Sequence, residues 1–259
     1  MFESYQLRLD WSQDLPRYWC DNSPFKTHFL NAQSIVFPSA ERFFISTVKQ
    51  HRENVTDPVL KAEVAEFVKQ EIWHTYAHEQ YNKWLDNQGF PAGDMAHASD
   101  RRFEWIKKTF SPRSQLAITV ACEHITALTG AHSLQNRSFL KRMDPHFENI
   151  WRWHSIEEVE HKSVTMDVYR TINGKTIRRQ LALIFAIMLY VWSVGKTTVQ
   201  LLHADKQLWK LQTAIDAWQM LFAPKGVIRE TWIKVLHFFR KDFHPTDHDD
   251  TQLMNFRKT

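Results

Sequence analysis

Two copies of the motif Glu-x-x-His, Glu71 to His74 and Glu158 to His161, are the residues of this sequence best suited to bind metal ions. Residues three or four positions apart on an α-helix project from the same face, so each pair can contribute to one ion. His154 lies one turn before Glu158 and extends the second pair to three residues on one face. With 14 Glu and 14 His in 259 residues, about one such motif is expected by chance. The motif alone therefore decides little.

Two single glutamates complete a more specific order. Glu41 precedes the first motif by 30 residues, and Glu123 precedes the second by 35, which are spacings that suit antiparallel helix pairs. Di-iron and di-manganese carboxylate bundles take one Glu from each of two helices and Glu-x-x-His from each of the other two. Four carboxylates offset the charge of two divalent ions, and neutral imidazoles suit iron. The order therefore predicts one shared two-metal site.

Solvated side chains on amphipathic helices are the alternative explanation of the same residues, since most helical carboxylates lie at a surface. Their neighbours argue against it, because Phe37 and Phe44 flank Glu41, and Phe67 precedes Glu71, at helical spacings. An ionised carboxylate in such apolar surroundings is costly unless a cation offsets it. The expected metal ligands are Glu41, Glu71, His74, Glu123, His154, Glu158 and His161.

Four nearby side chains have less certain roles in the sequence. For His154, the alternative to a third imidazole ligand is a histidine that only supports the ligands. His78 lies too far along its helix to share an ion with the first motif, and His124 points about 100° away from its neighbouring glutamate. We expect both to support ligands rather than to bind metal. Thr126 can orient a proton near the metals, and a plain buried threonine is the alternative.

The elements that must position these residues are helices. Only six glycines, against aromatic residues at 14%, argue against a turn-rich β-structure. Asp57-Pro58, Ser111-Pro112 and Asp144-Pro145 combine an N-cap residue with proline at the first helical position, so each predicts a helix start. Each of these helices carries a candidate carboxylate midway. We expect an all-α four-helix bundle with additional C-terminal helices.

The domain organisation follows from the same signals. We expect an N-terminal arm (1–24), one helical domain (25–243) with its core bundle at about 25–172 and extra helices at about 175–243, and a tail (244–259). Pro38 either kinks the first helix or begins a second one. Further helices are expected at 59–88, 100–110, from 112 onward, 145–172, 181–194, 205–222 and 226–243.

Leu181 to Val194 is the most apolar run of the chain. Its fourteen residues rise about 21 Å, short of the roughly 20 residues that cross a bilayer. We expect a helix that is buried on all sides, and the alternatives are peripheral contact with the inner membrane or a homodimer interface. The N-terminus lacks the pattern of a signal peptide, and Cys20 and Cys122 are expected to be reduced thiols, so a cytoplasmic location is predicted.

Charge is uneven along the chain. Residues 171–259 carry 13 basic and 7 acidic side chains, whereas residues 1–170 carry 20 and 22. The basic residues of the C-terminal third are dispersed among apolar ones, which favours a solvated helix face and predicts no nucleic-acid partner.

The segments FPSAERFF, EIWHTYAHEQ and WHSIEEVEHKSVTMDVY resemble those of a bacterial family described as predicted metal-dependent hydrolases, over most of the chain from about Thr27. The resemblance implies a ferritin-like core with two metal ions. The ligand order, His154 included, is also similar to that of the di-iron arylamine N-oxygenases, which use three His and four Glu. That second similarity is confined to the ligands, so it implies nothing about the substrate.

Two functions fit these observations. The first is a di-iron oxidase or oxygenase that uses O₂ and an external electron donor to oxidise a small apolar or amphipathic substrate, with two iron ions, or manganese or a mixed pair, as cofactor. The second follows the family description: a hydrolase in which two ions activate a bound water. We identify no separate general base or set of oxyanion donors for it. An iron-binding or structural helical protein is a third alternative.

Overall fold

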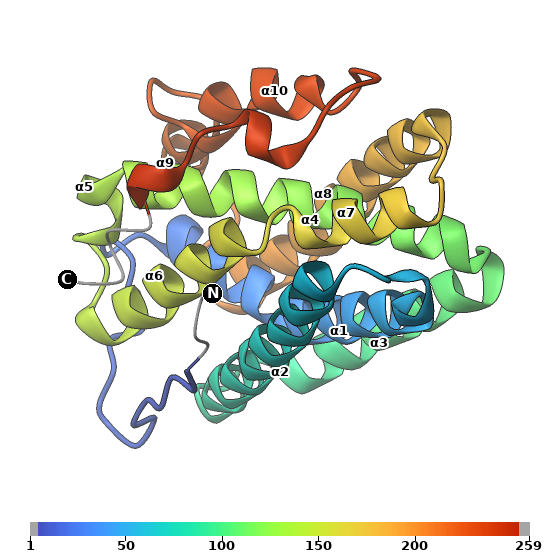
Figure 1. The fold of residues 1–259 in the computed structure, drawn as a ribbon. Helices are drawn as coiled ribbons and strands as arrows, with labels where there is room; N and C mark the ends of the chain where they lie inside the picture. Colours follow the sequence, from blue (N-terminus) through green and yellow to red (C-terminus); the bar gives the residue numbers. More distant parts are fainter. Residues whose placement is uncertain (1–4, 254–259) are drawn as a thin grey trace.

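The computed structural model describes residues 5–253, and these residues form an all-α fold (Figure 1). In this range the one extended pairing is an isolated bridge between Cys20 and Met143. The α-helices of the described residues are α1 (Pro24–Gln50), α2 (Pro58–Asn87), α3 (Ala92–Thr109), α4 (Pro112–Gln135), α5 (Arg137–Leu140), α6 (Pro145–Glu160), α7 (Val164–Thr171), α8 (Thr176–Ala204), α9 (Leu211–Leu221) and α10 (Val227–His237). Two 3-10 helices, η1 (Arg52–Asn54) and η2 (Pro245–Asp247), are also present. The predicted fold class is confirmed.

Capping residues explain where the four helices that carry the predicted ligands begin. In α2, α4 and α6 the predicted N-cap residue accepts a hydrogen bond from a first-turn amide, and proline occupies the first helical turn. Ser23 and Pro24 do the same for α1. Each cap satisfies one of the amide groups that a helix N-terminus leaves without an intrahelical partner. The three helix starts predicted from sequence are confirmed.

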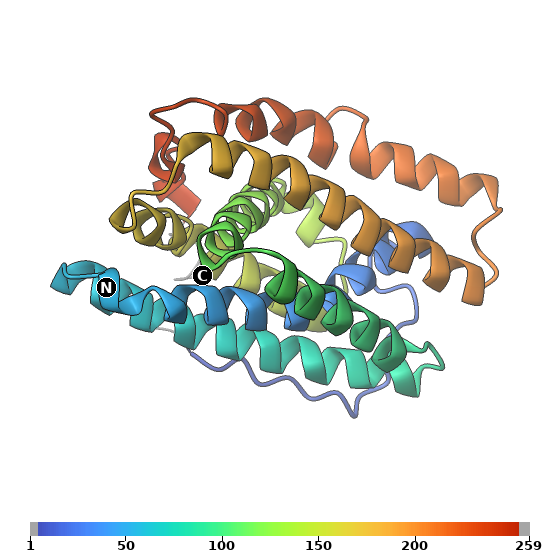
Figure 2. The same ribbon diagram turned by 90° about the vertical axis from the view of Figure 1, so that its right-hand side faces the viewer.

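Helix α1 lies at the centre of the packing. It contacts α2, α3, α4 and α8, and α4 in turn contacts α6, α8 and α10. Helices α9 and α10 lie on the opposite side of the molecule from α2 in both views (Figures 1 and 2). Two clusters of buried apolar residues fill the interior, one around α1, α2 and α6 and one around α1, α4, α7 and α8.

Several predicted boundaries are wrong. Helix α3 begins at Ala92 rather than at Asp100, because the Asp86 carboxylate accepts the Gly93 amide and satisfies a first-turn donor from outside the helix. The helix expected over 145–172 is broken between Glu160 and Val164. At this break Lys162 donates to the Asp250 carboxylate and to the His248 carbonyl. Pro38 lies inside one continuous α1.

The prediction that the apolar run of 181–194 is buried on all sides is also wrong. This run lies within α8. One face of α8 packs on α1 and α4. The opposite face is apolar as well, but exposed: 58% of Met188 and 62% of Trp192 are accessible. Helix α8 is long and apolar enough to cross a membrane by length and composition alone, a test that core helices also pass. Helices α9 and α10 are each shorter than predicted.

The two ends of the chain pack more closely than an arm and an irregular tail suggest. Trp19 stacks on Phe147 with ring centroids 4.3 Å apart. In the tail, His244 Nε2 lies 3.0 Å from Asp167 Oδ1, and Asp250 is buried. Residues 1–4 and 254–259 of the predicted arm and tail lie outside the described range.

Candidate metal centre

Four helices bring the seven predicted ligands to one buried region. Helix α1 carries Glu41, α2 carries Glu71 and His74, α4 carries Glu123, and α6 carries His154 and Glu158. His161 is the residue at which α6 ends, so its side chain still lies one turn beyond Glu158. Each of these seven residues is at most 3% exposed. The alternative of solvated surface residues is therefore excluded.

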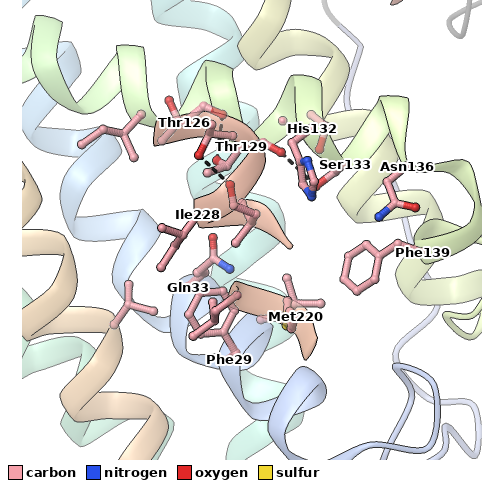
Figure 3. A pocket seen from close by; sticks show the side chains of 18 of the residues that line it. Phe29, Gln33, Thr126, Thr129, His132, Ser133, Asn136, Phe139, Met220 and Ile228 are labelled. Atoms are coloured by element: carbon pink, nitrogen blue, oxygen red, sulfur yellow. Dashed lines mark hydrogen bonds between the residues drawn. The ribbon is translucent and has the colours of Figure 1, made fainter. Parts of the chain in front are cut away.

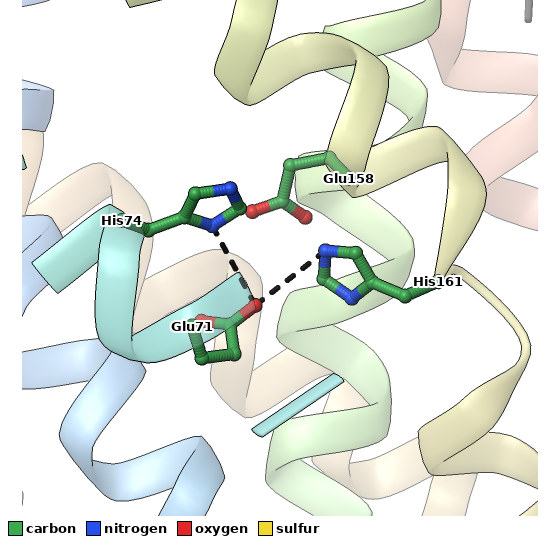
Figure 4. Close-up of side chains that lie close together, drawn as sticks. All are labelled: Glu71, His74, Glu158 and His161. Atoms are coloured by element: carbon green, nitrogen blue, oxygen red, sulfur yellow. Dashed lines mark ion pairs between the residues drawn. The ribbon is translucent and has the colours of Figure 1, made fainter. Parts of the chain in front are cut away.

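The carboxylate of Glu71 lies between the rings of His74 and His161 (Figure 4). Its Oε1 is 3.8 Å from His74 Nδ1 and 3.5 Å from His161 Nε2. On its other side, His161 Nδ1 is 3.3 Å from Glu123 Oε2. Single donor atoms of Glu71, His74, Glu158 and His161 lie within 4.8 Å of one another, and so do those of Glu41, His74 and His154. Two groups of ligands, each compact enough to bind one ion, thus share His74.

The carboxylates of this group lack the partners that buried charges need. Both oxygens of Glu41, Glu71 and Glu123 have no hydrogen-bond donor in bonding geometry. Burial and the negative charge of Glu158 raise the pKa of Glu41 and also that of Glu123, the latter to about 7. Burial, followed by the charge of Glu123, raises the pKa of Glu71 well above its usual range. Divalent cations would remove this cost, so these side chains form a metal-binding site.

The contact between His154 and Glu158 indicates where a cation fits. His154 Nε2 lies 3.0 Å from Glu158 Oε1, although the nitrogen has no hydrogen-bond partner in bonding geometry. Two adjacent ligands of an octahedral ion, each about 2.1 Å from it, are about 3 Å apart. Burial opposes ionisation of Glu158, but the neighbouring imidazoles of His154, His161 and His74 together outweigh it and lower the pKa of this carboxyl to about 2. The pair therefore has the spacing of two ligands of one ion.

A chain of hydrogen bonds sets the tautomer of His154. The Asn82 amide donates to the Ser34 carbonyl, so Asn82 Oδ1 accepts the Ser34 hydroxyl at 3.0 Å. Ser34 Oγ must then accept from His78 Nδ1, and His78 Nε2 accepts from His154 Nδ1, both at 3.0 Å. His154 Nε2 is left without a proton and faces the carboxylates. A histidine whose outer nitrogen is hydrogen-bonded in this way is held ready to bind metal.

His78 is thus expected to support metal binding without touching an ion. His78→Leu removes the acceptor of His154, and we expect a ten- to hundredfold loss of metal affinity, as for other residues that orient metal-binding histidines. His78→Gln keeps one donor and one acceptor and is expected to restore part of the loss. The measurement is anaerobic titration of the metal-free variants with Fe(II).

The matched control for this prediction is His124→Leu. His124 is also buried, but its Nε2 lies 3.3 Å from the Lys234 carbonyl, and its ring stacks on Phe238 of the segment after α10. The structure therefore does not bring His124 to the ligands. His124 packs against α10 and the segment after it instead. Equal losses of affinity in the His78 and His124 variants would contradict the role of the hydrogen-bond chain.

Glu157 is a residue of the site that the sequence analysis missed. It is fully buried on α6, its Oε1 accepts from Trp153 Nε1 at 3.1 Å, and its Oε2 lies 3.2 Å from His74 Nε2. A carboxylate at the outer nitrogen of a metal-binding imidazole fixes the ring and raises its basicity. The helical spacing of four between Trp153 and Glu157 is the signal that could have shown this residue beside the ligand stripe.

Thr126 lies beside the ligands, as expected. Its hydroxyl is 2.6 Å from Glu158 Oε2, to which it donates. It also lines a large cavity of about 990 Å³, whose walls come from α1, α4, α6, α8, α9 and α10 (Figure 3). At the inner end of this cavity lie His154 and Glu158, and most of the remaining lining is apolar. The site therefore has an apolar approach large enough for a small organic molecule.

A second, smaller cavity of about 50 Å³ touches the site from the α8 side. Glu41, Thr126 and Glu158 line it together with apolar side chains. Phe37 and Tyr190 line both cavities and so lie between them. The ligands are reached from two apolar spaces, which keeps bulk water away from them.

Comparison with known proteins agrees with this geometry. Residues 4–249 match the family model described as "predicted metal-dependent hydrolase". Searches of curated proteins and of solved structures give no match. The matched region contains all seven predicted ligands as well as His78 and Glu157. The chain belongs to the family of predicted metal-dependent hydrolases.

Proposed function

We propose that the buried cluster holds two iron ions and that the protein is a di-iron oxidase or oxygenase acting on an apolar or amphipathic substrate. The observation that carries this proposal is the donor set itself: four buried carboxylates and three imidazoles on α1, α2, α4 and α6. Glutamate and histidine donors of this kind in a helical bundle are typical of di-iron and di-manganese proteins. The helix order is also the basis for proposing a ferritin-like core.

The ions would supply the redox chemistry, in which O₂, two protons and two electrons from an external donor convert a substrate C–H group to C–OH and release one water. The chain contributes orientation and exclusion of water. Phe37 stacks on His154 with ring centroids 5.0 Å apart, and Phe67 packs against His161. Thr126 holds a hydroxyl at Glu158, where it can relay a proton between the carboxylate and the large cavity.

The cavity supports a substrate with a long apolar part. Its walls are mainly aliphatic and aromatic, and they include Phe29, Ile228 and Met220. Besides Glu158, the charged groups of the lining are few: Lys26 and Arg142, which both pair with Asp21, and Lys225. This distribution fits an amphipathic molecule whose apolar end reaches His154 and Glu158 and whose anionic end stays near the basic side chains.

A two-metal hydrolase is the alternative, and the family description favours it. In that chemistry the paired ions lower the pKa of a bound water and polarise a carbonyl or phosphoryl oxygen. The hydroxyl of Thr126, the ring of His154 and the carboxylate of Glu158 are the polar groups of the ligand region that line the large cavity. Such a substrate would have to place its polar bond in mostly apolar surroundings, so we place this function second.

One experiment separates the two functions. Protein loaded anaerobically with Fe(II) is exposed to O₂ while near-ultraviolet and visible absorption and O₂ uptake are recorded. An oxidase develops new absorption and consumes O₂, whereas protein loaded with zinc serves as the control and does neither. The oxidase proposal fails if iron-loaded protein neither changes its absorption nor consumes O₂, while zinc- or manganese-loaded protein cleaves acyl or phosphate esters.

A further inference from the structure

Helices α8, α9 and α10 expose three apolar stripes that no described part of the chain covers. In α9 the exposed large apolar residues recur at intervals of four, three and four, so they share one helix face. The same periodicity holds along α8 and, at intervals of four, along α10. The stripes consist of Ile177, Leu181, Ile184, Met188 and Val191 in α8, Leu211, Ile215 and Trp218 in α9 with Phe222 directly after it, and Ile228, Trp232 and Leu236 in α10.

These stripes meet at the mouth of the large cavity. One exposed residue of each stripe also lines the cavity. These residues are Val191 of α8, Phe222 directly after α9, and Trp232 of α10. The cavity thus opens where the stripes converge. Helices α9 and α10 lie on the side of the molecule opposite α2 (Figure 2). We call the exposed residues of 176–237 the α8–α10 face. Exposed apolar stripes that meet at a cavity in this way are typical of an interaction site rather than of ordinary surface.

Tryptophan and charge indicate what covers this face. Four exposed tryptophans belong to it, and Trp209 is 90% accessible. The others are Trp192, Trp218 and Trp232. Tryptophan is the side chain enriched where a protein meets the boundary between lipid headgroups and acyl chains.

The ionic groups around the tryptophans are almost all basic. The exposed basic residues of the α8–α10 face are Lys196, Lys206, Lys210, Lys225 and Arg229, whereas Glu230 is its one exposed acid. Two further acids in this range point inward: Asp205 pairs with Arg17 and His28, and Asp216 is buried against Ser23. A symmetric dimer would bring these lysines towards their own copies, whereas an anionic surface would neutralise them.

We propose that the α8–α10 face docks on the surface of an anionic lipid bilayer, with the cavity mouth open to the lipid. Helix α8 lies on the membrane and does not cross it, because its other face packs on α1 and α4. One consequence rests on the proposed function: the substrate is an amphipathic lipid with an acyl chain, and it passes from the bilayer into the cavity. Docking itself involves no metal, so its failure would leave the metal centre untouched.

Flotation with vesicles tests the proposal. The purified full chain, without metal, is mixed with vesicles of phosphatidylcholine alone or of phosphatidylcholine and phosphatidylglycerol in equal parts, then centrifuged through a density gradient. We expect the protein to float with the anionic vesicles. Lys206→Gln with Lys210→Gln is expected to weaken binding about thirtyfold, and Trp209→Ser with Trp218→Ser about tenfold or more.

Matched controls lie on α2, at the opposite side of the molecule. Lys61→Gln with Lys83→Gln removes the same charge, and Ile72→Ser with Tyr76→Ser removes exposed apolar side chains. Both are expected to float like the unchanged protein. All substituted positions are exposed, and circular dichroism with thermal unfolding verifies that each variant is folded.

Each possible result either supports or contradicts docking on the bilayer. Selective flotation that is lost in the α8–α10 variants and kept in the α2 variants supports docking. Unchanged protein that stays at the bottom with anionic vesicles overturns it. A dimer in solution that dissociates in the Trp209 and Trp218 double variant would also overturn it, because a second copy would then cover the face.

Discussion

Glu71→Gln is expected to abolish binding of at least one of the two metal ions and, in the same protein, to stabilise the metal-free fold. Glu71 lies between His74 and His161, so its loss removes the one carboxylate of the described residues that is within 3.8 Å of both of these imidazoles. We expect metal affinity to fall more than a hundredfold, beyond the effect of residues that only orient ligands.

The gain in stability has a separate cause. Without metal, Glu71 is a fully buried carboxyl with no donor at either oxygen, and burial and Glu123 raise its pKa. Glutamine has nearly the same shape and carries no charge, so the free energy of unfolding without metal is expected to rise by about 1–3 kcal/mol. Urea unfolding in the presence of a chelator measures it.

The control substitution is Glu63→Gln, at an exposed position of the same helix. It is expected to change neither metal content nor stability. A Glu71→Gln protein that retains two tightly bound metals, or that unfolds more easily than the unchanged protein when both are metal-free, would contradict the assignment of Glu71 as a metal-binding carboxylate.

Removal of metal is expected to make the fold less stable as the pH rises above about 7. The folded state raises the pKa of Glu123 to about 7 and raises those of Glu41 and Glu71, in each case chiefly by burial. Stability falls with pH over the interval in which the unfolded chain has released these protons and the folded chain still holds them. Glu123 therefore contributes below about pH 7, whereas Glu41 and Glu71, whose pKa values are raised well above the usual range, contribute at higher pH. His161 acts in the same direction, because Glu123 raises its pKa against the effect of burial.

Other groups limit the pH window in which this trend is visible. Burial lowers the pKa of His74, His78 and His124, so they favour folding only when neutral and act in the opposite direction below about pH 6.5. Glu158, with its pKa lowered to about 2, acts below about pH 4.5. Between about pH 7 and pH 8.5 Glu41 and Glu71 therefore dominate, together with His161.

Thermal unfolding at several pH values, with chelator and with Fe(II) under anaerobic conditions, checks this prediction. Metal-free protein is expected to have a Tm lower by about 5 °C or more at pH 8.5 than at pH 7. Metal-loaded protein is expected to lose this trend, because the ions hold the carboxylates in their ionised form and binding releases their protons. A metal-free Tm that rises over this interval would show that the carboxyls are not destabilising.

The ligand order was predictable because helical spacing is local. Glu-x-x-His places two side chains on one face of any helix, and Asp-Pro or Ser-Pro before α2, α4 and α6 located those helices along the chain. The structure brings all seven predicted residues into one buried region. That these seven bind two ions stays a prediction, which the experiments above address.

Other parts of the site depend on contacts between distant segments, which sequence spacing does not reveal. The hydrogen-bond chain from Asn82 through Ser34 to His78 joins α1 and α2. The break after Glu160 coincides with contacts of Lys162 to the tail, although the sequence HKS contains no helix-breaking residue. The exposure of α8 depends on where α9 and α10 lie, because the same apolar sequence is compatible with a core helix.

We expect the buried cluster to hold two ions per chain. The loading step of the O₂ experiment measures this number: metal-free protein is titrated anaerobically with Fe(II), and bound iron is counted after removal of excess metal. We expect binding to saturate at two iron per chain in the unchanged protein and below two in Glu71→Gln. Saturation at one ion or none, or equal binding in the Glu71→Gln variant, would contradict the two-metal account.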